Sequence, residues 1–273
     1  MKKPTIIFCI VAVLLLAAAA CLGFKLYQHE KAQNDELREL QSCQSAALAA
    51  AEELSARLTL IELKADYAEA SYKYFPLGNS ITVHAPNEVW WNEIGMAASD
   101  AEHDYVHLVS AFLSASHGKV ACHPYYFYAW ETAENRASKL SLLDPYLDSA
   151  LDLVTIQLGE NAEDLTTFEQ DFTDLIRYVQ AKAPGARILI IDDFWPNEER
   201  SKMKQSATEK TGAEFISLKE IQGISDMTAG TGAVVYDLAG NSHTVENADV
   251  AAHPGDKGMK AIADRIIKAL QAE

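Results

Sequence analysis

The sequence predicts an α/β fold in which a parallel sheet is covered by helices on both faces. Short apolar runs alternate with helical stretches from Ser71 to the C-terminus, which is the pattern of strands joined by crossover helices. The run Arg187-Ile188-Leu189-Ile190-Ile191 is almost continuously apolar, as expected for a strand that is buried on both faces. Residues 71–273 are therefore predicted to form the main domain.

The main domain is expected to contain strands, crossover helices and one late hairpin. The strands are predicted at Tyr72–Leu77, Val120–Tyr128, Leu151–Leu158, Ala186–Phe194 and Glu214–Leu218. The helices are predicted at Ala101–Ser116, Asp164–Ala183, Asn197–Thr211 and Asp256–Ala272. A hairpin or loop excursion is expected from Val234–Leu238 to Ser242–Val245, because Ala239-Gly240-Asn241 between them favours a tight turn.

The N-terminal segment, residues 1–25, is predicted to lie outside this fold. Two lysines precede an uncharged run over Pro4–Phe24, and a run of about 20 apolar residues can cross a bilayer. Positive charge before the run places the following chain outside the cytoplasm. We prefer a single-pass membrane anchor. A cleaved signal peptide fits the small residues Ala17–Ala20 and would give a secreted protein, and a lipoprotein signal would use Cys21.

Residues 26–70 contain neither glycine nor proline and are predicted to form a coiled-coil-like helix. Apolar or small residues recur there at alternating steps of three and four, which is a heptad pattern with Glu and Lys on its flanks. The seam consists of Leu37, Leu40, Gln44, Ala47, Ala51, Leu54, Leu58, Ile61, Ala65 and Ala68. The helix over 37–68 would space the domain from the membrane and form a homodimer, or it would fold back onto the domain.

Charge and cysteine content exclude some classes of function. The 273-residue chain has a formal net charge of −16, which argues against a nucleic-acid partner because phosphate neutralisation needs clustered Lys and Arg. Its four cysteines include no C-x-x-C pair, so neither a disulfide framework nor a structural zinc site is expected.

A candidate nucleophile follows the first strand, where the apolar run ends in Gly78-Asn79-Ser80. An open α/β sheet places its functional residues at the carboxyl ends of strands, so Ser80 is well placed for catalysis. Most serines at such positions cap helices instead. The G-x-S-x-G elbow of α/β-hydrolases is absent, because Thr82 occupies its last position.

Two further segments could complete a catalytic site around this serine. Gly159-Glu160-Asn161 follows the predicted strand Leu151–Leu158, and an asparagine amide there can donate to a developing oxyanion or simply form a turn. Near the C-terminus, Ala252-His253-Pro254-Gly255 leads into the last helix. A histidine on that loop can accept the serine proton as general base.

These segments, in this order, resemble the SGNH or GDSL-type serine hydrolases. The blocks are Gly78-Asn79-Ser80-Ile81, Gly95-Met96-Ala97-Ala98-Ser99, Gly159-Glu160-Asn161 and His253-Pro254 with Gly258 and Ala261-Ile262-Ala263. The resemblance covers roughly Tyr72 to Ala269. It implies a flavodoxin-like three-layer α/β/α fold, ester hydrolysis or acyl transfer, and no metal or organic cofactor.

The resemblance also implies the roles of individual residues. Ser80 would be the nucleophile and His253 the base, while the N–H groups of Ser80 and Gly95 and the Asn161 amide would form the oxyanion hole. The family usually carries an aspartate three residues before the histidine, where this chain has Val250. Asp249 lies one residue earlier and is the preferred third catalytic residue. A Ser–His dyad supported by a backbone carbonyl is the alternative.

The resulting hypothesis is a membrane-tethered, extracytoplasmic serine esterase that acts on acetyl or short-chain esters. A carbohydrate substrate is one option, because Trp90-Trp91, Trp195 and Tyr125-Tyr126 lie near predicted strand ends, where aromatic rings can stack on sugars or form core. The alternatives are an O-acyltransferase acting on envelope glycan and a catalytically decayed, coiled-coil anchored binding protein.

Two other groups of residues are candidate metal ligands, and neither makes a strong case. His103 and His107 stand at i and i+4 of a predicted helix, but Asp replaces the glutamate of H-E-x-x-H and no third ligand is evident. Asp192-Asp193 ends a predicted strand and would bind a cation or face solvent, the second being preferred. No metal site is therefore predicted.

Overall fold

The computed structural model describes residues 25, 27, 29, 31, 38, 41–48, 50, 54 and 57–272. The chain divides into two compact units, residues 1–59 and 60–273. The predicted membrane segment at Pro4–Phe24 lies outside the described residues. Within the part of the chain that is described, no helix combines the length and apolar character needed to cross a bilayer.

Every described residue of the first unit is helical, and the leucines among them, Leu48, Leu54 and Leu58, are exposed. Pairing of this helix with a second copy stays a prediction. The second unit also begins in helix, which ends at residue 69. There Leu63 and Tyr67 are buried in the core of the domain, so the domain begins at Leu60, where the sequence suggests 71.

The central sheet is parallel, as the sequence predicts. Its strands are β1 (Tyr72–Gly78), β2 (Val120–Cys122), β3 (Tyr125–Tyr126), β4 (Leu153–Gln157), β5 (Arg187–Ile191) and β6 (Glu214–Ile216). They lie in the order β2-β1-β4-β5-β6, with β3 also paired to β1. With β2 and β3 taken as one strand, this is the 2-1-3-4-5 order of flavodoxin-like folds.

The predicted strand Val120–Tyr128 is divided into β2 and β3 and ends earlier than expected. Both pieces pair with β1 in one continuous register, with Tyr74 opposite Cys122 and Leu77 opposite Tyr125. Pro124 separates the pieces because it has no N–H to give to the ladder. The short helix α3 (Tyr128–Glu131) follows at once.

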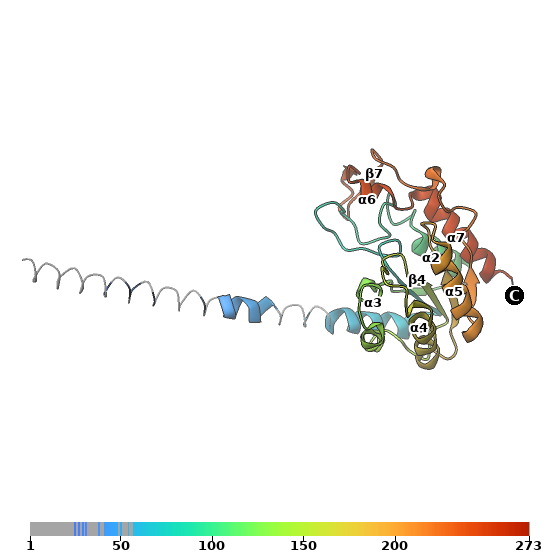
Figure 1. Cartoon of the computed structure of the whole chain (residues 1–273), viewed down its shortest axis with the longest axis horizontal. Helices are drawn as coiled ribbons and strands as arrows, with labels where there is room; N and C mark the ends of the chain where they lie inside the picture. Colours follow the sequence, from blue (N-terminus) through green and yellow to red (C-terminus); the bar gives the residue numbers. More distant parts are fainter. Residues whose placement is uncertain are drawn as a thin grey trace, which may run out of the picture. The chain divides into compact units, whose positions relative to one another are not determined.

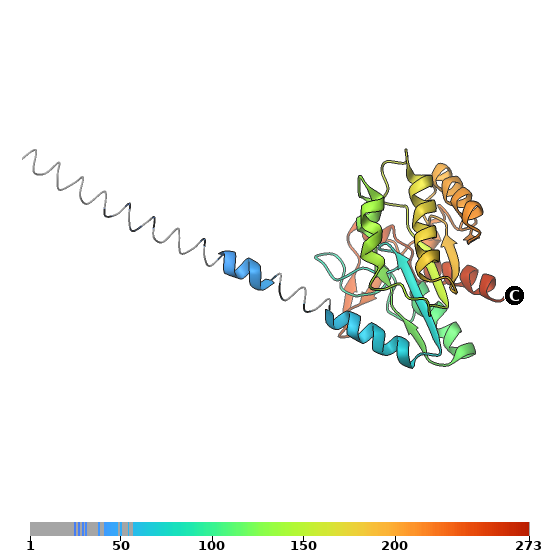
Figure 2. The same ribbon diagram turned by 90° about the horizontal axis from the view of Figure 1, so that it is seen from below.

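Helices cover both faces of the sheet (Figures 1 and 2). They are α2 (Tyr105–His117), α4 (Phe168–Lys182), α5 (Glu198–Thr211) and α7 (Asp256–Leu270), close to the four predicted helices. Leu189 and Ile191 of β5 face a core cluster shared with α2 and α7. Ile188 and Ile190 face the opposite cluster, shared with α4 and α5. This alternation explains the continuous apolar run in β5.

The remaining elements are short and mostly lie around the carboxyl edge of the sheet. They include the 3₁₀ helices η1 (Arg136–Leu143) and η2 (Ser225–Met227) and the helix α6 (Ala248–Ala251). The predicted hairpin is confirmed as the antiparallel pair β7 (Val234–Tyr236) and β8 (Ser242–Thr244). Its turn contains Gly240 at φ 83°, a conformation that favours glycine.

The strand order creates one switch point, between β1 and β4. The chain leaves β1 for the edge strand β2 and leaves β4 for β5 on the other side. The loops that follow β1 and β4 therefore diverge, and folds of this class bind ligands at the carboxyl ends of the strands at such a point. Ser80 follows β1 and Asn161 follows β4, so both stand at this switch point.

Candidate active site

A tight turn after β1 presents Ser80. Gly78 must be a glycine here, because a Cβ on it would lie 1.8 Å from Thr82 Oγ1. Asn79 closes the turn: its Oδ1 accepts from the N–H of Ile81 at 3.1 Å, and its backbone carbonyl accepts from the N–H of Thr82 at 2.9 Å. The turn leaves the Ser80 side chain partly exposed between buried neighbours.

The C-terminal loop brings His253 to this serine. His253 Nε2 lies 2.8 Å from Ser80 Oγ, and His253 Nδ1 lies 2.7 Å from the backbone carbonyl oxygen of Asp249. A carbonyl only accepts hydrogen bonds, so Nδ1 carries the proton of the neutral ring. Nε2 is then the acceptor for the serine hydroxyl, which is the tautomer that a general base needs.

The partner of the base is therefore the main chain of Asp249 and not the carboxylate that we preferred from the sequence. Asp249 lies in the first turn of α6, where Asn247 Oδ1 caps the helix by accepting from the N–H groups of Asp249 at 2.9 Å and Val250 at 3.0 Å. The Asp249 side chain is exposed. In so short a helix the terminal carbonyls lack helical partners, and the His253 ring satisfies one of them.

Neighbouring backbone holds the His253 loop in place. The segment after η2 donates to it twice, from Ala229 N–H to the His253 carbonyl and from Gly230 N–H to the Ala251 carbonyl, both at 2.9 Å. A Cβ on Gly258 would lie 2.2 Å from the Met227 carbonyl oxygen, so α7 can approach this segment only with glycine there. The Trp195 ring meets the imidazole edge-on at 5.0 Å.

Burial lowers the pKa of His253 below its ordinary value of 6.5, and a nearby His84 charge lowers it further. The Asp249 carbonyl opposes this shift by accepting the Nδ1 proton. The net effect keeps the imidazole neutral near pH 7, which is the state in which it can accept a proton.

The loop around Gly95 packs tightly behind the nucleophile. The Met96 N–H donates to the Ser80 carbonyl at 2.7 Å, and a Cβ on Gly95 would lie 2.5 Å from the Ile81 carbonyl oxygen. Within residues 57–272, the hydrogen bonds of these two loops use the N–H groups of Ile81 and Met96 but not those of Ser80 or Gly95. Two backbone donors next to the nucleophile are thus available to an oxyanion.

Asn161 stands on the turn after β4. Gly159 begins this turn at φ 131°, and the turn closes through a 2.9 Å hydrogen bond from the Ala162 N–H to the Gly159 carbonyl. Asn161 Nδ2 donates to Glu131 Oε2 at 2.7 Å. An amide nitrogen carries two hydrogens, so one N–H of Asn161 remains for a ligand.

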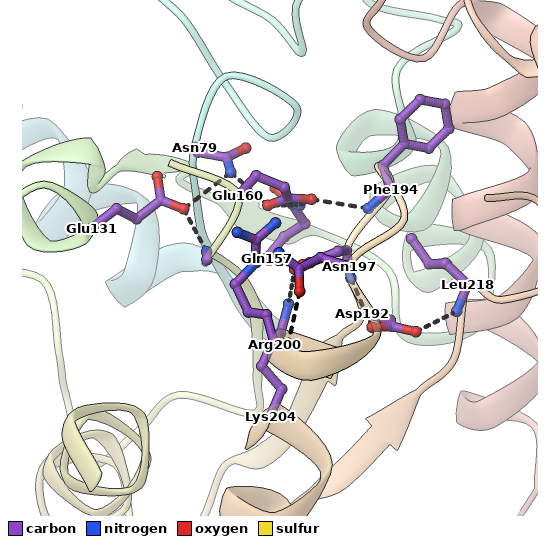
Figure 3. A network of polar contacts seen from close by, with 12 residues as sticks. Asn79, Glu131, Gln157, Glu160, Asp192, Phe194, Asn197, Arg200, Lys204 and Leu218 are labelled. Carbon is purple, nitrogen blue, oxygen red and sulfur yellow. Dashed lines mark hydrogen bonds and ion pairs between the residues drawn. The ribbon is translucent and has the colours of Figure 1, made fainter. Parts of the chain in front are cut away.

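Sequence reasoning missed the two carboxylates that connect these turns, Glu131 and Glu160. Asn79 Nδ2 donates to Glu160 Oε2 at 2.8 Å and to Glu131 Oε1 at 3.3 Å, so it lies between them (Figure 3). Glu160 also accepts from both Gln157 Nε2 and the Phe194 N–H. The sequence offers one signal for Glu131: it is a single carboxylate at the end of the aromatic and apolar run Tyr128-Ala129-Trp130, and a glutamate is rarely buried unless it has partners.

Burial and nearby charges raise the pKa values of both carboxyl groups. For Glu160, burial and the Asp193 charge raise the pKa to about 7, against a lowering effect of Lys204. For Glu131, burial raises the pKa while the hydrogen bonds from Asn161, Gly159 and Asn79 lower it. An aspartate in place of Asn79 would therefore be a third carboxylate in contact with Glu131 and Glu160.

Asp192 and Asp193 neither face solvent nor form a cation site. Asp193 is fully buried and pairs with Arg200 and, at 3.1 Å, with Lys204 Nζ, which is fully buried too. Asp192 is also buried and accepts from the Leu218 N–H at 3.4 Å. The two aspartates anchor the start of α5 and the loop after β6 beneath the site.

The histidine pair does not have the predicted helical arrangement. α2 begins at Tyr105, so His103 precedes the helix and only His107 lies in it. Each histidine bonds its own aspartate through Nδ1, His103 with Asp100 at 2.6 Å and His107 with Asp104 at 2.7 Å. Among the described residues, no group of three or more His, Cys, Asp or Glu is arranged to hold a metal ion.

The aromatic residues near the strand ends divide between core and surface. Trp90 is fully buried, and Trp91 stacks on His243 at 4.4 Å. Tyr126 and Tyr128 are exposed, and their rings are parallel within 1° at a centroid distance of 5.9 Å. Both belong to the segment that follows β2 and leads to Glu131.

A cavity of about 580 Å³ opens beside Asn161. Most of its lining is polar, and carboxylates outnumber the single cation. The lining residues are Tyr128, Glu131, Thr132, Ala133, Glu134, Arg136, Glu160, Asn161, Glu163, Asp164 and Thr167. Hydroxyl groups and cations suit such a wall better than a long alkyl chain does.

Several solved structures of GDSL-like lipases and esterases match this chain. A GDSL-like lipase from Parabacteroides merdae matches at 16% identity and a TM-score of 0.47, over 73% of this chain and 95% of that chain. Phospholipase A1 from Streptomyces albidoflavus matches at 13% identity and a TM-score of 0.46, over 73% of this chain and 99% of that chain. A two-domain esterase active on acetylated mannans matches at 15% identity and a TM-score of 0.49, over 80% of this chain and 53% of that chain.

No protein-family model and no curated protein matches the chain. These three structures have identities of 16% or less and TM-scores below 0.5. The assignment of catalytic roles therefore rests on the geometry of Ser80 and His253.

Replacing the Asp249 side chain is expected to leave the nucleophilic reactivity of Ser80 nearly intact. Asp249→Asn keeps the backbone carbonyl that holds His253 Nδ1, so kcat/KM for a p-nitrophenyl ester should stay within about twofold of wild type. Serine hydrolases whose aspartate orients the base lose about 10⁴-fold on the same change. A loss of that size would show that the carboxylate supports the base. Asn247→Ala is the variant to compare with Asp249→Asn. It removes the side chain that caps α6, the helix that carries the Asp249 carbonyl, and should lower kcat.

Asn79→Asp is expected to destabilise the protein by about 2–4 kcal/mol at pH 8, because it places a third carboxylate against Glu160 and Glu131. The loss should shrink as the pH falls through about 7, where Glu160 takes up a proton. Urea unfolding at several pH values measures it.

The double variant Asn79→Asp with Glu160→Gln should recover most of that stability, because the glutamine amide can donate to the new aspartate. An Asn79→Asp protein as stable as wild type, or a double variant without recovery, would contradict the arrangement around Asn79.

Proposed function

We propose that this chain is a serine ester hydrolase of the SGNH or GDSL type. The observation that carries the proposal is the pair of hydrogen bonds made by His253, with Ser80 Oγ at 2.8 Å and with the Asp249 carbonyl at 2.7 Å. A serine, a base and a group that orients the base, in hydrogen-bond contact at the carboxyl edge of a parallel sheet, are the elements of nucleophilic acyl transfer.

In the proposed reaction, Ser80 Oγ attacks the ester carbonyl carbon while His253 Nε2 takes the serine proton. The resulting imidazolium is stabilised at Nδ1 by the Asp249 carbonyl. The same Nε2 proton then passes to the departing alcohol, which leaves an acyl group on Ser80. Water attacks this acyl-enzyme with His253 again as base, releasing the carboxylic acid and restoring the serine.

The oxyanion of each tetrahedral intermediate would be held by three donors. These are the backbone N–H groups of Ser80 and Gly95, which make no hydrogen bond within residues 57–272, and the N–H of Asn161 that Glu131 does not use. Each donor of this kind contributes roughly 3–4 kcal/mol of barrier lowering. All three come from loops at the switch point between β1 and β4.

For the substrate, we propose acetyl or short-chain esters of a polyhydroxylated alcohol such as a carbohydrate. The polar cavity beside Asn161 suits a hydroxylated group, and the exposed parallel rings of Tyr126 and Tyr128 could stack against a sugar face. A panel of p-nitrophenyl esters of increasing chain length tests the acyl preference. Transfer to a glycan alcohol that outpaces hydrolysis would instead indicate an O-acyltransferase.

We further propose that the domain is tethered outside the cytoplasm by the N-terminal segment and that the helix over 37–68 pairs with a second copy. The tether is supported by the lysines and the apolar run at Pro4–Phe24, and the pairing by the exposed Leu54 and Leu58 of the heptad seam. Membrane fractionation of the full-length chain and cross-linking through Cys43, which is exposed on this helix, test the two statements.

Ser80→Ala is expected to abolish hydrolysis of p-nitrophenyl acetate, because no other group replaces the nucleophile. Asn161→Ala should lower kcat by about 10²–10³-fold with little change in KM, since it removes an interaction that strengthens only in the transition state. Turnover by Ser80→Ala equal to wild type would rule out the proposed reaction. A wild-type protein that a fluorophosphonate probe does not label would indicate a decayed site.

The pH dependence of kcat/KM should follow the protonation of His253. Only the neutral imidazole accepts the serine proton, so activity is expected to fall as the pH drops through an apparent pKa below 6.5 and to level off above pH 7. His84→Gln removes a positive charge that lowers this pKa, so its profile should shift upward. An acidic limb above 6.5 in the wild-type protein would contradict the buried, neutral base.

A further inference from the structure

We propose that Glu131 is a positioning residue for catalysis: its buried carboxylate holds the Asn161 amide in the orientation that the oxyanion hole requires. The inference rests on the proposed esterase function. It concerns a residue in α3, which precedes the asparagine turn by about a helix and a strand and carries none of the recognisable sequence blocks.

The partners of the Glu131 carboxylate all belong to the turns after β1 and β4. Oε2 accepts from Asn161 Nδ2 at 2.7 Å, and Oε1 accepts from the Gly159 N–H and, at 3.3 Å, from Asn79 Nδ2. One carboxylate thus joins Asn79, the residue before the nucleophile, to Gly159 and Asn161 of the turn after β4. Its side chain is 1% exposed, so water does not compete for these contacts.

The bond to Asn161 restricts the whole amide group. A side-chain amide is planar, so holding one N–H against Glu131 Oε2 determines the plane and the direction of the second N–H and of Oδ1. Asn161 itself is only half-buried. Without the carboxylate, rotation of its amide would present Oδ1, an acceptor, in place of the donor that an oxyanion needs.

Arg136 fixes the helix that supplies Glu131. Its guanidinium Nη2 donates to the Glu131 carbonyl at 3.4 Å and to the Asp164 carbonyl at 2.8 Å, and Nη1 pairs with Asp171 at 3.0 Å. Arg136 is 5% exposed and lies over the Trp130 ring. The end of α3 and the loop after Asn161 are therefore held by the same cation, which keeps the carboxylate at a set distance from the amide.

The charge and number of acceptor sites at position 131 matter for this role. A carboxylate offers only acceptors, and its partners are all N–H groups: those of the Asn161 and Asn79 amides and the backbone N–H groups of Gly159 and Asn161. Glutamine has the same shape but turns one oxygen into an NH₂ donor. In Glu131→Gln, either the Gly159 N–H or the Asn161 amide must then face another donor, and the half-buried Asn161 side chain is the one free to turn away.

The test is a double-mutant cycle on kcat. Glu131→Gln is expected to lower kcat for p-nitrophenyl acetate by about 10–100-fold with KM within about twofold, since the oxyanion contact exists only in the transition state. In an Asn161→Ala background the same change should cost less than about threefold, because there is no amide left to orient. Equal losses in both backgrounds, or wild-type kcat in Glu131→Gln, would overturn the proposal.

Two further variants separate positioning from general damage. Asp104→Asn alters another fully buried carboxylate, which bonds His107 and, within residues 57–272, no residue of the site, and its kcat should equal that of wild type. Glu131→Asp keeps the charge but withdraws it by one methylene. If Glu131→Gln does not fold, Glu131→Asp should still show a kcat loss that vanishes in the Asn161→Ala background, and an additive loss there would overturn the proposal.

Failure of this inference is distinguishable from failure of the esterase function. If Ser80→Ala is inactive and wild type is active, the esterase assignment stands whatever the cycle shows. Additive losses in the cycle would then remove only the role of Glu131.

Discussion

The hydrogen bond between Ser80 Oγ and His253 Nε2 is the contact on which the site depends, and it joins residues 173 positions apart. The parallel sheet makes this contact possible. β1 delivers the serine to the carboxyl edge, and the loop between α6 and α7 returns the histidine to the same edge. The bond has the correct direction because a backbone carbonyl holds the proton on the other ring nitrogen.

Beneath that contact, buried charges organise the strand ends. Glu131 and Glu160 accept hydrogen bonds from N–H donors of the loops after β1, β4 and β5 (Figure 3). Asp193 pairs with Arg200 and Lys204 of α5. Buried carboxylates are costly unless their acceptor sites are filled, and here backbone and amide N–H groups fill them. The two glutamates also explain why an asparagine, rather than an aspartate, precedes Ser80: the amide donates to both, and an aspartate would place a third carboxylate against them.

The fold and the contact between Ser80 and His253 could be predicted from the sequence, because both leave local patterns. Apolar runs such as Ile188–Ile191 report burial on two faces, and small residues around Ser80 and His253 mark tight turns. The partner of the imidazole could not be predicted, since it depends on whether the residues at 248–251 form a helix that exposes a carbonyl or a loop that turns the Asp249 side chain inward. Glu131 escaped prediction because its contacts lie 28 and 52 positions away and follow no motif.

The most direct measurement of the central claim is a crystal structure of the protein after reaction with a small fluorophosphonate, which mimics the tetrahedral intermediate. The proposed reaction predicts phosphorus bonded to Ser80 Oγ, with one phosphonyl oxygen within about 3 Å of Ser80 N, Gly95 N and Asn161 Nδ2. It also predicts that His253 Nδ1 still bonds the Asp249 carbonyl. Phosphorus on another residue, or a phosphonyl oxygen directed away from all three donors, would contradict the proposed site.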